Sequence, residues 1–175
     1  MHALVVYESS FGNTGLVAEA VWRGLADHVE DAALRRVNVA PTRLDPDVRL
    51  LVVGGPTQAF GLSRPSTRAD AQSKGSLPLA TGPTTGVREW LHLLEAPNRP
   101  VYSATFDTRI HSPHVPGSAA VGAWRLLSKG GFELTAEAES FWVTGLKGPL
   151  RDGELDRAYE WGVSLSALLL GAARR

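Results

Sequence analysis

A short apolar run, a polar loop that contains a glycine and an amphipathic helix follow one another at the start of the chain. Residues 3–7 read Ala-Leu-Val-Val-Tyr, a continuous apolar run that is typical of a strand buried on both faces of a parallel sheet. Residues 9–14 form the polar loop, and from Thr14 to His28 the apolar residues recur at helical spacing. This succession predicts a strand, a tight loop and a helix, which together form the first unit of an α/β fold.

Four further strand-like runs follow, and helical patterns separate most of them. The strand-like runs are residues 34–39, 50–53, 101–106 and 141–143. The helical patterns beyond the first are residues 87–94, 119–129 and 154–170. Five strands that alternate with helices predict an α/β fold with a doubly wound parallel sheet between two helical layers, and we expect the strand order 2-1-3-4-5.

The bulk composition excludes several classes of function. The 18 basic residues balance 18 acidic residues, and the chain has no cysteine. A neutral chain lacks the charge excess that favours nucleic acid or an anionic membrane. Without cysteine there is no disulfide, thiolate metal ligand or thiol nucleophile, so any redox chemistry requires a cofactor. Because the chain has 175 residues and no signal-like or membrane-spanning run, we expect one cytoplasmic domain over residues 1–175.

Residues 61–83 do not fit a minimal domain of this kind. The segment is rich in Ser, Pro, Gly and Thr and shows neither a helical nor a strand period. We therefore expect a long loop at the end of the sheet where ligands bind. The loop is basic within a neutral chain, because it carries one acidic residue, Asp70, against three basic ones, Arg64, Arg68 and Lys74.

The loop at residues 9–14 carries the main indication of function. A turn from a buried strand into a helix points backbone N–H groups and the positive end of the helix dipole at one place, which suits a phosphate. Gly12 permits a close approach or a positive φ. Neutral hydrogen-bond donors come from the side chains of Ser9, Ser10, Asn13 and Thr14. The alternative interpretation is a polar loop that only ends the strand and caps the helix.

Other site motifs are absent or incomplete. The chain has neither a triphosphate-binding loop with its lysine, nor a dinucleotide fingerprint with three spaced glycines, nor a Gly-x-Ser-x-Gly hydrolase motif. His111 and His114 have a spacing that metals sometimes use, but no third ligand is near them in the sequence, so we expect no metal site. We interpret the five tryptophans as packing residues; they are Trp22, Trp90, Trp124, Trp142 and Trp161.

The loop sequence Ser9-Ser10-Phe11-Gly12-Asn13-Thr14 resembles the phosphate loop of the flavodoxin family, whose pattern after the first strand is Ser/Thr-x-x-Gly-Asn-Thr. The resemblance implies a three-layer flavodoxin-like fold and FMN as the cofactor. It also implies that the phosphate is bound by the side chains of Ser9, Ser10, Asn13 and Thr14 and by the backbone N–H groups of Phe11 and Gly12.

Two later loops resemble the flavin-binding loops of the same family. The loop after the third strand, residues 55–61, is similar to the Gly-x-Pro-Thr type found in flavodoxin-like quinone reductases. This similarity places Phe60 beside the flavin ring, with burial of Phe60 in the core as the alternative, and adds Pro56, Thr57 and Gln58 to the cofactor site. The loop after the fourth strand would face the other side of the ring and contribute Thr105, Phe106, Asp107 and Arg109, with Asp107 near the pyrimidine edge. The aromatic residue that the family often has there is replaced by Phe106 or His111.

The charges around this site differ from those of the family, whose members are acidic around the flavin. The expected rim here carries Arg64, Arg68, Lys74 and Arg109. Positive groups stabilise a reduced, anionic flavin and raise its two-electron potential. They also attract a small anionic substrate or an acidic redox partner protein. The sequence is also compatible with a homo-oligomer.

The leading hypothesis is an FMN-binding electron-transfer protein that passes electrons one at a time between a reductase and an acceptor. One alternative is an FMN-dependent NAD(P)H quinone or nitro reductase, which the Gly-Pro-Thr loop and the basic loop favour. The other is a flavodoxin fold that has lost its flavin and serves as an interaction module, which the change of aromatic residue favours. Because one fold carries many functions, the site must decide among them.

Overall fold

A parallel sheet forms the centre of the molecule. The computed structural model describes residues 2–75, 85–111 and 116–172. The described strands are β1 (His2–Tyr7), β2 (Asp31–Arg36), β3 (Val48–Gln58), β4 (Gly61–Leu62), β5 (Tyr102–Ile110), β6 (Glu133–Leu134) and β7 (Glu139–Val143). The helices are α1 (Asn13–Ala26), the 3-10 turn η1 (Val37–Val39), α2 (Pro65–Ser73), α3 (Val87–Leu93), α4 (Ala119–Lys129) and α5 (Glu154–Ala172).

The strand order confirms the expected topology. Within the described residues the sheet runs β2-β1-β3-β5-β6, with β7 also paired to β5. The pairs of β1 with β2 and β3, and of β5 with β3, β6 and β7, are all parallel. Since β5 and β7 correspond to the fourth and fifth predicted strands, the order is 2-1-3-4-5. Among the described strands, only β4, which forms a hairpin with β3, is antiparallel.

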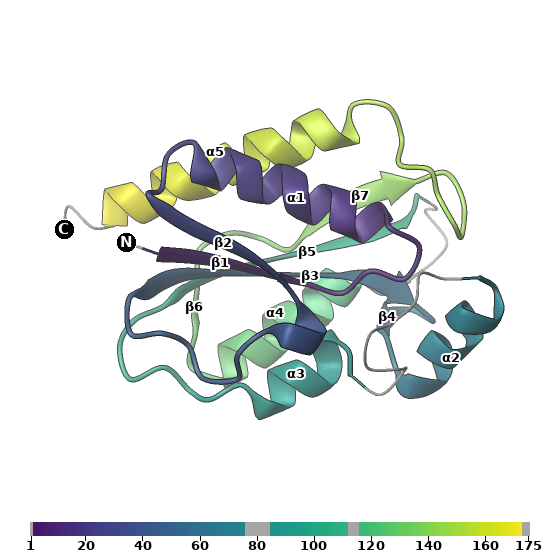
Figure 1. The fold of residues 1–175 in the computed structure, drawn as a ribbon, viewed down its shortest axis with the longest axis horizontal. Helices are drawn as coiled ribbons and strands as arrows, with labels where there is room; N and C mark the ends of the chain where they lie inside the picture. The colour runs from purple at the N-terminus through teal and green to yellow at the C-terminus, as the bar shows by residue number, and fades with distance from the viewer. Residues whose placement is uncertain (1, 76–84, 112–115, 173–175) are drawn as a thin grey trace.

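Helices cover both faces of the sheet, as Figure 1 shows, with α1 and α5 on one face and α3 and α4 on the other. The strand β1 explains this arrangement, because its side chains alternate between the two faces. Ala3 and Val5 pack under α1 and α5, whereas Leu4 and Val6 pack in the core on the opposite face of the sheet, which α3 and α4 cover. A strand buried on both faces has no polar side, which is why residues 3–7 form an unbroken apolar run.

Two glycines bring α1 and α5 into backbone contact. A Cβ atom at Gly24 would lie 2.2 Å from the carbonyl oxygen of Tyr159, and one at Gly162 would lie 2.3 Å from that of Val21. Any larger side chain at either position would therefore force the helices apart. This contact fixes α1, and with it the loop that precedes α1, against the rest of the molecule.

The structure corrects the expected loop over residues 61–83. Gly61 and Leu62 form β4, and residues 65–73 form α2; residues 76–83 lie outside the described residues. Pro65 stands at the start of α2, where its fixed φ favours a helix, and the Thr67 hydroxyl accepts a hydrogen bond from the backbone N–H of Arg64 at 2.8 Å. Figure 1 shows α2 and the β3–β4 hairpin together at the carboxyl end of the sheet.

Two strands also continue beyond their predicted ends. β3 extends to Gln58 and β5 to Ile110, because Gly54, Gly55 and Pro56 pair in register with Phe106, Asp107 and Thr108. The Gly-Gly-Pro sequence indicated a turn, but pairing with β5 keeps it extended. The second predicted strand begins earlier than expected and ends at Arg36, where η1 starts.

Among the described helices, none is long and apolar enough to cross a membrane.

Candidate functional site

The loop between β1 and α1 has the geometry of an anion site. Gly12 directly precedes α1 and has a φ of 95°, the left-handed conformation that glycine adopts without steric cost. The buried Ser9 hydroxyl accepts hydrogen bonds from the backbone N–H groups of Gly12 at 3.1 Å and Gly15 at 3.2 Å. Ser9 therefore shapes the loop from inside, and the phosphate contact that the resemblance implied for its hydroxyl stays a prediction.

Other N–H groups of this loop remain available to a ligand. In residues 2–75, 85–111 and 116–172, no acceptor pairs with the backbone N–H groups of Phe11, Asn13 and Thr14. Asn13 and Thr14 begin α1, where unpaired N–H groups and the helix dipole create a positive potential. This arrangement favours a negatively charged group such as a phosphate.

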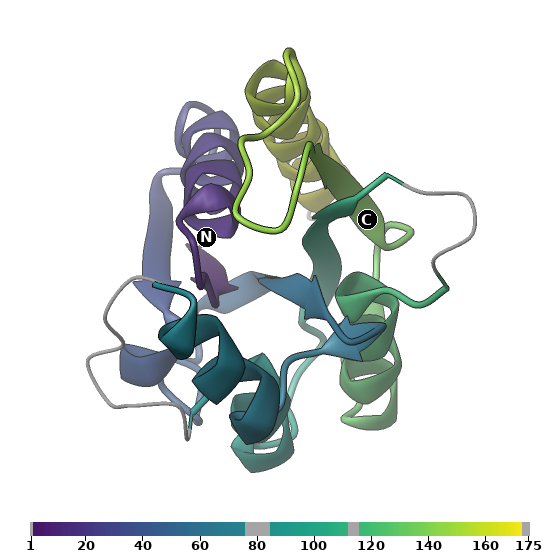
Figure 2. The same cartoon turned by 90° about the vertical axis from the view of Figure 1, so that its right-hand side faces the viewer.

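A cavity of about 80 Å³ lies against this loop and is formed by four segments of the chain. Three of these segments are the loops that were expected after the first, third and fourth predicted strands, and the fourth segment follows β7. Figure 2 shows this fourth segment, which precedes α5, reaching down beside the start of α1. The lining residues are Ser10, Phe11, Asn13, Thr14, Pro56, Thr57, Gln58, Thr108, Arg109, Ile110, Val143, Gly145 and Leu146. None of these lining residues carries a carboxylate, which suits an anionic ligand.

The segment after β7 was missed by the sequence analysis. The Asn13 side-chain amide donates a hydrogen bond to the carbonyl oxygen of Lys147 at 3.0 Å. A Cβ atom at Gly148 would lie 2.5 Å from the Asn13 Oδ1 atom, so glycine there allows the close approach. The peptide bond between Gly148 and Pro149 is cis. The signal in the sequence was the Gly-Leu-Lys-Gly-Pro run, which is typical of a tight turn.

Thr108 lies in the third expected loop, residues 105–109, but was not predicted as a contact residue. Its hydroxyl lies 2.6 Å from that of Thr14, in a buried contact between β5 and the first turn of α1. Had β5 been predicted to run to Ile110, strand alternation would have placed Thr108 on the same face as Ala104 and Phe106, beneath α1.

Gln58 connects the second loop of the site to the first loop, and Thr57 connects the second loop to β5 and to the start of α4. The Gln58 amide donates to the Ser10 hydroxyl at 2.9 Å, and its buried Oε1 atom has no donor in the described part of the chain. The Thr57 hydroxyl donates to Asp107 at 2.8 Å and accepts from the backbone N–H of Ala119, also at 2.8 Å. Thr57 thus supports the wall of the cavity, and the Gln58 oxygen is an acceptor that a ligand N–H or O–H group would satisfy.

Asp107 has a different role from the one expected. Its carboxylate is fully buried and accepts hydrogen bonds from Thr57, from the Ser118 hydroxyl and from the backbone N–H of Ala120 at 3.1 Å. The negative charge therefore faces the positive end of α4 and stabilises that helix terminus. Asp107 is not among the residues that line the cavity, so the structure does not place it at the edge of a flavin.

Phe106 and Thr105 are also buried beneath helices and do not line the cavity. The Phe106 ring makes edge-on contacts with Phe141 and Trp161, each at 6.0 Å between ring centroids. Space for the ring exists because residue 54 is glycine, where a Cβ atom would lie only 2.0 Å from the Phe106 ring. Both side chains therefore belong to the core.

Phe60 lies neither in the core nor in this cavity. It occupies the tip of the β3–β4 hairpin with a side chain that is 62% exposed. The other aromatic candidate, His111, contacts the ring of Trp142 edge-on at 4.8 Å, and His114 lies outside the described residues. The structure thus places Phe11 and not Phe60 in the wall of the cavity.

The expected basic rim is only partly present. Arg109 lines the cavity, and its guanidinium lies 5.3 Å from the Trp142 ring. Arg64 is exposed, and the exposed Lys74 pairs with Asp70 at 2.7 Å. Arg68, by contrast, is 1% exposed, so it is a buried structural cation and not part of a solvent-facing rim.

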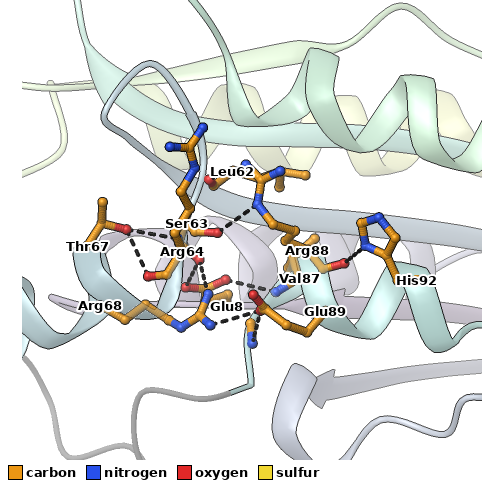
Figure 3. Close-up of polar contacts among 11 residues, drawn as sticks. Glu8, Leu62, Ser63, Arg64, Thr67, Arg68, Val87, Arg88, Glu89 and His92 are labelled. Atoms are coloured by element: carbon orange, nitrogen blue, oxygen red, sulfur yellow. Dashed lines mark hydrogen bonds and ion pairs between the residues drawn. The ribbon is translucent and has the colours of Figure 1, made fainter.

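Arg68 belongs to the polar network drawn in Figure 3, which joins β1, α2 and α3. It donates to the Ser63 hydroxyl at 2.7 Å and to Glu89 at 2.8 Å. Glu8, which follows β1, accepts from Ser63 at 2.6 Å and from the backbone N–H of Val87 at 2.9 Å. Burial raises the pKa of the Glu8 carboxyl, although these two hydrogen bonds and the charge of Arg68 act in the opposite direction. The network holds α2 and α3 beside the loop between β1 and α1.

Solved structures with this fold are flavodoxins and related proteins. A flavodoxin from the domain Archaea superposes with a TM-score of 0.66 at 17% identity, over 97% of this chain and 99% of that chain. Flavodoxin 1 from Bacillus cereus superposes with a TM-score of 0.67 at 12% identity, over 98% of both chains. A flavodoxin, WrbA-like protein from Agrobacterium tumefaciens superposes with a TM-score of 0.61 at 18% identity, over 97% of this chain and 98% of that chain. No protein-family model and no curated protein sequence matches the chain. The fold is therefore that of the flavodoxins.

Proposed function

We propose that this flavodoxin-fold chain binds FMN and transfers electrons through it. The observation that carries the proposal is the set of backbone N–H groups at Phe11, Asn13 and Thr14, which have no acceptor among the described residues and belong to residues that line a cavity without carboxylates. The left-handed Gly12 and the buried Ser9 hydroxyl hold these groups in place without a bound ligand. A preformed anion site at the carboxyl end of the sheet is where ligands bind in doubly wound folds.

The donors present fit the phosphate of FMN. Neutral N–H and O–H donors from the loop and from the Thr14–Thr108 pair surround the space, and Arg109 supplies one positive charge. A phosphate would be held by the Phe11, Asn13 and Thr14 N–H groups and by the hydroxyls of Ser10 and Thr14. When bound, FMN supplies one- and two-electron redox chemistry that the side chains of this chain lack. The unpaired Gln58 oxygen gives the remainder of the ligand an acceptor.

A titration of the purified apoprotein with FMN, followed by absorbance and flavin fluorescence, tests this proposal. Saturable one-to-one binding is expected, and Thr14→Ala is expected to weaken it because one phosphate donor is lost. Arg99→Ala, at an exposed position outside the cavity, serves as the control and should bind FMN as the natural chain does. Absence of saturable binding would remove the redox function and leave the interaction-module hypothesis.

A reductase that takes electrons from NAD(P)H is the second candidate. It is favoured by the Gly-Pro-Thr sequence of the second loop, since Pro56 and Thr57 do line the cavity. Addition of NADH or NADPH to the FMN-loaded protein distinguishes the two functions. Reduction of the flavin without a second protein indicates the reductase, whereas reduction only through an added reductase protein indicates electron transfer.

A further inference from the structure

A basic groove of about 660 Å³ lies between α3 and α4, outside the phosphate cavity. Arg88 and His92 line it from α3, and Arg125 and Lys129 line it from α4. The groove begins at the carboxyl end of the sheet, where Arg109 lines both this groove and the phosphate cavity. It follows α4 from Ser118 to Lys129, which at 1.5 Å per residue is a length of roughly 16 Å.

The described residues place no carboxylate against the positive charge of this groove. None of its described lining residues carries a carboxylate. In the described part of the chain, Arg88 donates only to the backbone carbonyls of Leu62 and Ser63, and Arg125 and Lys129 form no salt bridge. In a chain with equal numbers of acidic and basic residues, these cations form a local positive field that favours an anionic partner.

Phe60 stands at the end of this groove in a conformation that its residue type disfavours. Gln58 and Gly61 pair across the hairpin, so Ala59 and Phe60 form a two-residue turn, with φ values of 43° and 70°. Such turns favour Asn and Gly, because positive φ strains residues with a Cβ atom. The strained turn holds a large aromatic ring 62% exposed, and exposed aromatic rings are frequent anchors of protein interfaces.

We propose that the groove, with Phe60 at its end, docks an acidic segment of a partner protein. The groove-lining basic residues lie one helical turn apart on each of two helices, with Arg88 and His92 on α3 and Arg125 and Lys129 on α4, so they are spread along a line instead of converging on one point. This distribution matches a row of carboxylates better than a single phosphate. The docked segment would end beside Arg109. The inference that the partner then lies close to the cofactor rests on the proposed function, whereas docking itself needs no flavin.

The proposal is tested by titrating the full chain, without FMN and at low salt, with a synthetic peptide of about 12 alternating glutamates and leucines. Binding is followed by the NMR shifts of the backbone amides. Shifts are expected on α3, α4 and the hairpin, and affinity is expected to fall as salt rises. The double variant Arg125→Glu, Lys129→Glu should weaken binding by about tenfold or more. The control Arg35→Glu, Arg99→Glu makes the same change in net charge outside the groove and should leave binding within about twofold.

Each other outcome overturns the proposal. No binding at low salt, or equal weakening in both double variants, would exclude a groove-specific site. Inorganic phosphate that displaces the peptide at low concentration would indicate a small-anion site, and tighter binding of a single-stranded oligonucleotide would indicate nucleic acid. FMN affinity, measured separately, should be unchanged in both double variants, so failure of the docking proposal and failure of FMN binding are distinguishable.

Discussion

The side-chain hydroxyl of Thr14 lies 2.6 Å from that of Thr108, in a buried contact between residues 94 positions apart. Thr14 stands in the first turn of α1 and Thr108 stands on β5, and both line the cavity against the loop between β1 and α1. When two hydroxyls share one hydrogen bond, only one of their two protons is used. The pair therefore ties the loop to the sheet and keeps one donor available to a ligand oxygen.

Replacement of Thr108 by valine is expected to weaken FMN binding by up to about tenfold, since the hydrogen bond that orients the Thr14 hydroxyl is lost and a neutral hydrogen bond contributes about 0.5–1.5 kcal/mol. Part of the loss arises because the Thr14 hydroxyl loses its partner. Thr108→Ser retains the hydroxyl and should restore most of the affinity. The measurement is an FMN titration of the three proteins, and equal affinity of Thr108→Val and the natural chain would show that the pair does not contribute.

The Glu8 network predicts an unusual dependence of stability on pH. Burial raises the pKa of this carboxyl above 4.5, so between 4.5 and the raised pKa the folded protein holds a proton that the unfolded chain has released. The contribution of Glu8 to the free energy of unfolding is therefore full below 4.5 and declines as the pH rises through that interval. In urea unfolding across this pH range, the difference in the free energy of unfolding between the natural chain and Glu8→Gln should decrease as the pH rises. A difference that rises with pH would contradict the account.

Glu154 predicts the opposite dependence. Burial alone would raise the pKa of its carboxyl, but hydrogen bonds from Arg157 and from the backbone N–H of Trp142, together with the charge of Arg157, hold it below 4.5. Its contribution to stability is present above 4.5 and is lost as the pH falls through the lowered pKa. In the same urea experiment, Glu154→Gln should be less stable than the natural chain at neutral pH. The deficit should disappear in acid, and a deficit that persists there would show that lost packing, not charge, is responsible.

Arg109 predicts a shift of the flavin potential. Its positive charge lines the cavity and favours a reduced, more negative flavin. Arg109→Gln should lower the second one-electron potential of bound FMN by an amount on the order of tens of millivolts. Arg99→Gln, outside the cavity, is the matched control. A redox titration in which both variants have the potential of the natural chain would show that Arg109 does not tune the flavin.

Local patterns in the sequence predicted the parts of the site that depend on local structure. The loop at Ser9 and Gly12 follows from one strand, one turn and one helix, each visible within about 30 residues. Arg68 could not be placed in this way, because its burial depends on Ser63 and on Glu89, which stands 21 positions away on another helix. A basic residue in a polar segment indicates solvent exposure until its partners are known.

Strand length decided the other differences. When a strand continues, each side chain alternates between the faces of the sheet, and a predicted loop residue becomes a core residue or a wall of the site. Phe106 and Asp107 were expected at the cofactor because the strand was predicted to end at residue 106. Pairing with Gly54 and Gly55 extends β5, and the two side chains point into opposite layers.

The most direct test of the central claim compares FMN with riboflavin, which lacks the phosphate, on the natural chain and on Thr14→Val. If the loop before α1 binds the phosphate, FMN should bind the natural chain at least about a hundredfold more tightly than riboflavin, since several hydrogen bonds to a charged group are lost. The preference should shrink in Thr14→Val while riboflavin affinity stays nearly constant. Equal affinity of the natural chain for the two flavins would contradict a phosphate site in this loop.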